Sequence, residues 1–235
     1  MFRRKIKKSK RVRHMYKEER DAIFRKLKEG LPEFWDGKES IKYMKDEGCR
    51  QWRQMEWPGF YFQFMCETIL SEEGFMDIPG PKYDKVEFDG FKTIPWDFKA
   101  HSIPPSLEDN EQIPTNGFEE CIKAIDEYGA VGFIIMSGLT EYDDDGQSFK
   151  IWHDELKGGM SEYEKERIRR KAPSRRRKVS FKPKELIFVF VDDDNIDSCG
   201  KFQKNFRNSD GRPRKSKILL DLKRNDSLKV YRYDF

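Results

Sequence analysis

Residues 80–102 read GPKYDKVEFDGFKTIPWDFKAHS, and this stretch decides the fold that the sequence predicts. Apolar residues recur at strand spacing on both sides of the dipeptide Asp89-Gly90. Asp-Gly suits the positive φ angles of a two-residue hairpin turn. The stretch is therefore predicted to form two antiparallel strands that meet at Asp89-Gly90.

Further helices and strands are predicted on either side of this hairpin. Apolar residues at helical spacing predict helices over residues 14–30, 38–47, 60–74 and 117–128. Short apolar runs predict strands over residues 130–136, 185–191 and 217–222. This order indicates an α/β protein of the α+β type, with a mixed central β-sheet flanked by helices.

Composition and charge restrict the possible partners. Of the 235 residues, 38% are charged and 14% are aromatic, which indicates a packed core inside a highly charged surface. The net charge is only +4, but basic residues gather in three runs, over residues 3–13, 165–178 and 204–217. A single run is often only solvated surface, whereas three together favour a polyanionic partner.

The cysteines and the hydropathy indicate an intracellular setting. Four cysteines lie far apart without a CxxC pair, so we expect free thiols and neither a zinc ribbon nor a disulfide framework. No apolar run approaches the length that spans a bilayer, and no apolar signal core follows the basic residues 3–13. A soluble, cytoplasmic protein without a membrane partner is expected.

Two carboxylates and a lysine in the predicted hairpin carry the candidate chemistry. Folding about Asp89-Gly90 would bring Asp84 close to Asp97, with a bulge at Pro95 closing the gap. Because side chains alternate along a strand, Asp97 and Lys99 should share one face while Phe98 enters the core. Carboxylates can hold Mg²⁺, and a lysine can position water and oppose developing charge, as phosphodiester hydrolysis requires.

These residues resemble the motif of the PD-(D/E)xK nucleases, particularly type II restriction endonucleases. Asp84 matches the first acidic position and Asp97-Phe98-Lys99 the second, although Lys82-Tyr83 separates Pro81 from Asp84. The resemblance spans about residues 54–136 and implies a restriction-endonuclease-like core that binds one or two Mg²⁺ ions per active site. It implies one endonuclease domain over residues 1–235, divided into a basic tail (1–13), the catalytic core (54–136), a polar and basic excursion (140–180), and a core strand with a DNA-recognition segment (185–235).

The resemblance also implies a glutamate from the helix before the first strand. Either Glu67, near the apolar side of its predicted helix, or Glu56, at a predicted helix start, fits that place, and their spacing does not choose between them. A surface or capping role is the alternative for each. His101 lies two residues beyond Lys99 on the same predicted face and is a weaker candidate for contact with the site or a phosphate.

Two of the basic runs are predicted to contact double-stranded DNA. Mixed amide, hydroxyl and guanidinium groups near a turn can read base edges, which points to Asn205, Arg207, Asn208, Ser209, Arg212, Arg214 and Lys215. The more uniformly charged run containing Arg175, Arg176 and Arg177 suits the phosphate backbone. Symmetric cleavage of both strands favours a homodimer, although a monomer that nicks twice is an alternative.

Other motifs are missing or fail. The acidic residues 141–146 do not continue as a calcium loop, because Trp152 stands where the bidentate glutamate belongs. The sequence contains no P-loop or dinucleotide fingerprint, so no nucleotide cofactor is expected. Two rival functions remain: a repair or junction-resolving nuclease with the same active site, and a non-catalytic nucleic-acid-binding protein.

Overall fold

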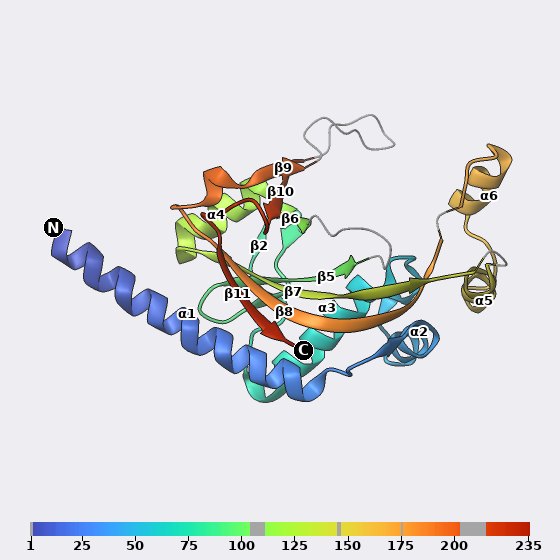
Figure 1. The fold of residues 1–235 in the computed structure, drawn as a ribbon, viewed down its shortest axis with the longest axis horizontal. Coiled ribbons are helices and arrows are strands. Elements are labelled where there is room, and N and C mark those ends of the chain that lie inside the picture. Colours follow the sequence, from blue (N-terminus) through green and yellow to red (C-terminus); the bar gives the residue numbers. More distant parts are fainter. Residues whose placement is uncertain (1, 104–110, 145–146, 175, 203–214) are drawn as a thin grey trace.

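The computed structural model describes residues 2–103, 111–144, 147–174, 176–202 and 215–235. Within them, a curved mixed sheet of six strands forms the centre of the protein (Figure 1). Its strands are β1 (Trp35–Asp36), β4 (Gly90–Phe91), β5 (Pro95–Ile103), β7 (Val131–Tyr142), β8 (Lys178–Val191) and β11 (Lys229–Asp234). The order is β1-β8-β7-β5-β4, and β11 pairs with β8 beside β1. The predicted mixed α/β class is confirmed.

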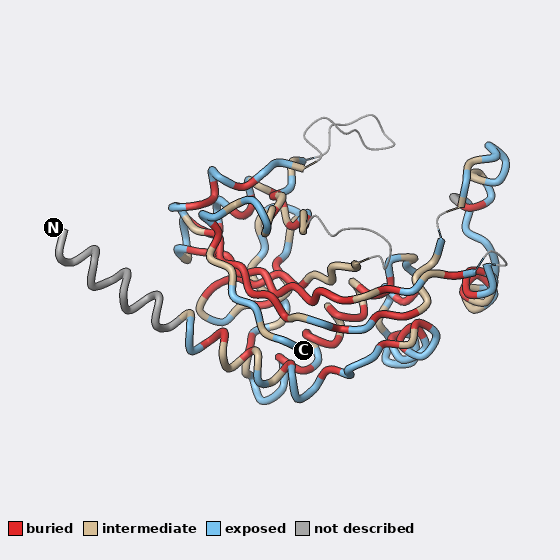
Figure 2. The backbone as a smooth tube through the Cα atoms, in the orientation of Figure 1, coloured by how far each residue is buried: buried red, intermediate tan, exposed pale blue. Residues whose placement is uncertain are grey.

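Helices cover one face of the sheet. These are α1 (Phe2–Gly30), α2 (Gly37–Asp46) and α3 (Trp57–Ser71), and the short helices η1 (Arg50–Arg53) and η2 (Glu72–Gly74) flank α3. They bury an aromatic-rich core against the sheet, in which Trp35, Trp57 and Phe62 are at most 1% exposed. Figure 2 shows these buried segments meeting the central strands. The helices predicted over residues 14–30, 38–47 and 60–74 are confirmed as α1, α2 and α3. Residues 2–13, which were expected to form a tail, belong to α1.

The other face carries α4 (Phe118–Tyr128) and a three-stranded sheet. That sheet has the order β6-β10-β9 and consists of β6 (Gln112–Gly117), β10 (Lys217–Asp221) and β9 (Gly200–Phe202), with η3 (Ile196–Ser198) before β9. Cys121 and Ile125 of α4 pack with Phe133 and Ile135 of β7. The second core explains why β7 and β8 read as continuous apolar runs, because both of their faces are covered.

The segment between β7 and β8 forms a helical excursion from the sheet. It contains α5 (Ser148–Leu156) and α6 (Glu162–Arg169), which lie at the far end of the long β7–β8 pair (Figure 1). Lys150 is buried there and pairs with Asp154 at 3.2 Å and Glu164 at 2.9 Å.

In the described ranges, no helix is both long and apolar enough to cross a bilayer.

The hairpin prediction is wrong in register. Phe91 pairs with Pro95 and Gly90 with Trp96, so the turn between β4 and β5 comprises residues 92–94 and not Asp89-Gly90. Packing requires glycine at position 90, because a Cβ there would lie 2.5 Å from the sulfur of Met76. The residues before it form a separate hairpin of β2 (Lys82–Tyr83) and β3 (Val86–Glu87).

A close contact between β5 and β7 gives a test of the core. A Cβ on Gly132 would approach the Trp96 ring to 2.3 Å, and both residues lie in the parallel β5–β7 pair. We expect Gly132→Ala to lower the free energy of unfolding by about 1–3 kcal/mol, because the ring must move in a close-packed core. Urea unfolding measures the change.

Gly59 provides the matched control for this substitution. It lies in α3, has no atom within 4 Å of an added Cβ and does not have a positive φ. Gly59→Ala should leave the free energy of unfolding unchanged or raise it by up to about 1 kcal/mol. Equal effects of the two alanines would show that the Gly132 contact is unimportant.

Candidate active site on strand β5

Strand β5 places Asp97 and Lys99 on the face opposite Phe98. Phe98 is 1% exposed and packs in the core on the side of helices α1–α3. Asp97 pairs in register with Phe133, which belongs to the core on the other side. The Lys99 Nζ atom lies 2.7 Å from Asp97 Oδ2, with side-chain exposures of 28% and 2%. The predicted shared face of Asp97 and Lys99 is confirmed.

Asp89, and not Asp84, is the carboxylate beside Asp97. If the β4–β5 register is continued by one residue beyond Gly90 and Trp96, Asp89 stands opposite Asp97. Asp89 Oδ2 accepts a hydrogen bond of 2.6 Å from the backbone amide of Phe98. The carboxylate therefore occupies the position that a backbone carbonyl of a neighbouring strand would take. This contact fixes the carboxyl group at the open edge of β5, next to Asp97.

Asp84 lies in the turn between β2 and β3, with φ of 58°. Its half-exposed carboxylate pairs with Lys215 Nζ at 2.6 Å, and the same ammonium group lies 2.5 Å from Oε1 of the buried Glu120. The expected convergence of Asp84 with Asp97 depended on the wrong turn. The structure instead joins Asp84 to Lys215, which was predicted to contact DNA.

The structure separates the two glutamate candidates. Glu67 accepts a hydrogen bond of 2.8 Å from Gln63 Nε2, and the same nitrogen donates to Asp89 Oδ1 at 2.8 Å. Glu56 precedes α3 and pairs with Lys178 at 2.5 Å on β8. The two glutamates are eleven positions apart along α3, which corresponds to a rise of about 16 Å. Glu67 therefore joins the β5 cluster and Glu56 does not.

Asn116 completes the contacts of Asp97 from the end of β6. Its Nδ2 atom donates to Asp97 Oδ1 at 2.9 Å. The other oxygen, Asp97 Oδ2, is buried and pairs with the Lys99 ammonium at 2.7 Å, although no hydrogen bond of good geometry reaches it from the described residues. We define the β5 cluster as Glu67, Asp89, Asp97, Lys99, Gln63 and Asn116.

The surroundings of the β5 cluster shift the pKa values of three of its side chains. Burial raises the pKa of Asp89 well above its usual value, and the adjacent carboxyl of Asp97 raises it further. Burial also raises the pKa of Glu67, against the effect of the Gln63 hydrogen bond. Burial lowers the pKa of Lys99, but the Asp97 and Asp89 carboxylates outweigh it and leave that pKa above its usual value. Lys99 is therefore a cation at neutral pH.

The raised pKa of Asp89 predicts a pH dependence of stability in EDTA. Its stabilising contribution is fully present below the unfolded-state pKa of about 3.9 and is lost as the pH rises through the higher folded-state pKa. We expect Asp89→Asn to remove this loss, so the difference in free energy of unfolding between variant and wild type should move in favour of the variant as pH rises. Urea unfolding from pH 4 to pH 8 measures it, and parallel profiles would contradict the shift.

Most of the predicted DNA-binding residues lie outside the described residues. These are Arg175, Asn205, Arg207, Asn208, Ser209, Arg212 and Arg214. Among the others, Arg176 donates two hydrogen bonds to the Asp143 carbonyl oxygen, at 2.9 and 2.6 Å. Arg177 is half-buried immediately before β8, and His101 is half-buried on β5 opposite Ser137 of β7.

The β5 cluster contains carboxylates of the kind that bind a divalent cation. Within the described residues, no three histidine, cysteine, aspartate or glutamate side chains gather closely enough to form a metal site by themselves. Mg²⁺, however, usually takes one or two carboxylates and completes its shell with water and substrate phosphate. Asp89 and Asp97 supply two hard carboxylates, and Asp97 Oδ2, which no hydrogen bond of good geometry reaches from the residues described, lies 2.7 Å from the Lys99 ammonium that a bound cation would displace. The pair fits such an ion.

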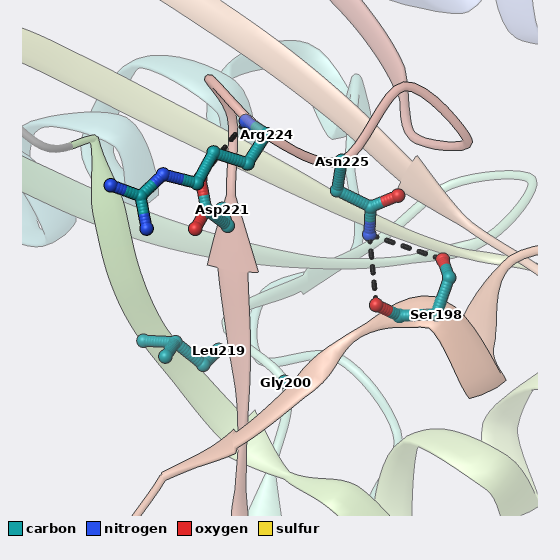
Figure 3. A pocket seen from close by; sticks show the side chains of 6 residues that line it. All are labelled: Ser198, Gly200, Leu219, Asp221, Arg224 and Asn225. Atoms are coloured by element: carbon teal, nitrogen blue, oxygen red, sulfur yellow. Dashed lines mark hydrogen bonds between the residues drawn. The ribbon is translucent and has the colours of Figure 1, made fainter.

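A shallow pocket elsewhere does not coincide with this cluster. It measures about 330 Å³ and lies on the three-stranded sheet, lined by Ser198, Gly200, Leu219, Asp221, Arg224 and Asn225 (Figure 3). Asn225 Nδ2 already donates to the Ser198 carbonyl oxygen at 3.0 Å and to its hydroxyl at 3.1 Å. None of the predicted site residues lines the pocket.

Comparisons with known proteins give no independent assignment. No family model, curated protein or solved structure matches the chain.

Asp89, Gln63 and Asn116 are the members of the cluster that the sequence did not single out. Asp89 had a usable signal, since Phe88-Asp89 precedes Asp97 by a distance that a short hairpin can close. Asp89 was not considered as a site residue, because Asp89-Gly90 was predicted to form the turn. Gln63 lies four residues before Glu67 in one helix, but only the packing of α3 against the β4–β5 edge brings its amide to Asp89.

Proposed function

We propose that the protein is a magnesium-dependent endonuclease that hydrolyses phosphodiester bonds in double-stranded DNA. The observation that carries this proposal is the placement of Asp89, Asp97 and Lys99 together at the edge of β5. Carboxylates repel phosphate unless a cation lies between them, so a buried acidic pair beside a lysine suits metal-assisted hydrolysis. Within this proposal, Asp89 takes the first acidic position in place of Asp84.

Each member of the β5 cluster then has a defined role. Asp89 and Asp97 would hold the cation, which supplies hydroxide and binds a phosphate oxygen. Asn116 orients the Asp97 carboxylate through Oδ1, and Oδ2, which pairs with Lys99 here, would bind the cation once the ammonium moves aside. Lys99 remains protonated between the carboxylates, so it stabilises negative charge on the phosphate and orients water by hydrogen bonding.

The type II restriction endonuclease class is the more specific proposal. It is supported by the resemblance of Asp97-Phe98-Lys99 to the second motif and by the glutamate, Glu67, that reaches the cluster from the preceding helix. Readout of base sequence is assigned to residues 205–215 and backbone contact to residues 175–177. A homodimer would place two such clusters for cleavage of both strands.

Incubation of the purified protein with linear plasmid DNA and Mg²⁺ tests this function. We expect discrete fragments that disappear with EDTA and in Asp97→Ala. A smear lost in both controls would replace sequence-specific cleavage with a nonspecific nuclease, and preference for branched DNA would favour a junction or repair nuclease. Salt-sensitive binding without cleavage would instead support the non-catalytic reading.

A further inference from the structure

One amide group links the helix and the strand that carry the acidic residues. Gln63 and Glu67 are four residues apart in α3, so their side chains lie on one face. Gln63 Nε2 donates to Glu67 Oε1 and to Asp89 Oδ1, both at 2.8 Å. The two carboxylates therefore approach the same nitrogen from different elements.

The chemistry of this link suits a site that must retain negative charge. A primary amide has two hydrogens and can satisfy two carboxylates without adding a charge. A second lysine, in addition to Lys99, would neutralise a further carboxylate and compete with a metal ion. Glutamine thus holds Glu67 and Asp89 in position while it leaves their charge available for a cation.

We propose that Gln63 is a positioning residue, which orients Glu67 and Asp89 for a divalent cation. This inference rests on the proposed metal-dependent function and deepens it. Groups that orient metal ligands by hydrogen bonding commonly change metal affinity by about 10–100-fold when they are removed. Gln63 acts in this way on Asp89, whose other oxygen is held by the Phe98 amide.

Binding of Mn²⁺ alone, followed by electron paramagnetic resonance, tests the inference without cleavage. Gln63→Met has a similar length and no hydrogen-bonding amide, and we expect it to weaken Mn²⁺ binding by about 10-fold or more. Gln54→Met is the matched control, because Gln54 is exposed just beyond η1, and its Mn²⁺ affinity should equal that of wild type. The KM for duplex DNA at saturating Mn²⁺ should stay unchanged in Gln63→Met.

Gln63→Glu gives a second measurement that does not depend on the methionine variant. It replaces the donating amide by a fourth carboxylate in the β5 cluster, so its Tm in EDTA should be lower than that of wild type. Mn²⁺ should raise this Tm by more than it raises that of wild type, because the ion relieves the added repulsion. Gln63→Met with wild-type Mn²⁺ affinity would overturn the positioning role. Gln63→Glu with the wild-type Tm in EDTA would also overturn it, because this side chain would then not face Glu67 and Asp89.

The two proposals can fail separately. If wild type binds Mn²⁺, Gln63→Met weakens that binding and no DNA is cleaved, the nuclease function is lost and the role of Gln63 stands. If wild type cleaves DNA and Gln63→Met binds Mn²⁺ normally, only the role of Gln63 is lost. If wild type does not bind Mn²⁺, the positioning role is rejected.

Discussion

Asp97→Asn is expected to reduce Mg²⁺-dependent cleavage of duplex DNA by about 10³-fold or more. The amide keeps the size of the side chain, but it removes the carboxylate that faces Lys99 and the proposed cation. A loss of 10³-fold corresponds to about 4 kcal/mol of transition-state stabilisation, within the several kcal/mol that a Lewis-acidic metal provides. Single-turnover cleavage at saturating enzyme measures it.

The folded state of Asp97→Asn must be checked alongside its activity. The amide oxygen introduced by the substitution can still accept the hydrogen bond that Asn116 Nδ2 gives to Asp97 Oδ1. Near-ultraviolet circular dichroism should therefore match that of wild type, and DNA binding in EDTA should change little. Retention of more than a tenth of wild-type cleavage by a well-folded Asp97→Asn would remove Asp97 from the active site.

Asp89→Asn and Asp84→Asn are expected to separate the two candidates for the first acidic position. Asp89 lies opposite Asp97 at the edge of β5, so its replacement should lower cleavage by about 10³-fold. Asp84 pairs with Lys215 at the surface, where solvent screens the pair and its loss has little effect. We therefore expect Asp84→Asn to keep cleavage within about 5-fold of wild type.

Parallel measurement of the two variants makes the comparison decisive. Both substitutions keep the size of the side chain. Lys215 lowers the pKa of Asp84 whereas burial raises the pKa of Asp89, so the two variants are compared at saturating enzyme and not at equal net charge. Single-turnover rates at several Mg²⁺ concentrations should show the loss only for Asp89→Asn. The opposite order, with Asp84→Asn inactive and Asp89→Asn active, would restore the motif alignment that the sequence first suggested.

The elements with strong periodicity could be predicted from the sequence. Helix α4 ends at Gly129 in the left-handed conformation, and its apolar spacing signalled the helix correctly. Strands β7 and β8 were recognisable because cores on both faces make them continuously apolar. The shared face of Asp97 and Lys99 followed from strand alternation alone.

The hairpin register could not be obtained in the same way. Asp89-Gly90 has the composition of a turn, but Gly90 is needed where Met76 packs against the backbone. Such a requirement comes from a residue on another segment, which local turn preferences do not include. The wrong register predicted that Asp84 lies close to Asp97 and that Asp89 lies in the turn.

The remaining members of the cluster depend on tertiary packing. Glu67 and Glu56 were equivalent in sequence, and only the position of α3 beside β4 brings Glu67 to Asp89 through Gln63. Asn116 reaches Asp97 because β6 ends next to β5 before α4 begins. Contacts of this kind join distant segments, so periodicity and spacing could not identify them.

Anomalous diffraction from crystals of the wild-type protein soaked with Mn²⁺ shows whether the β5 cluster binds a divalent cation. We expect a peak between the carboxylates of Asp89 and Asp97, within bonding distance of Asp97 Oδ2. A peak at Asp84 and Glu120, or no peak near β5 at saturating Mn²⁺, would contradict this expectation.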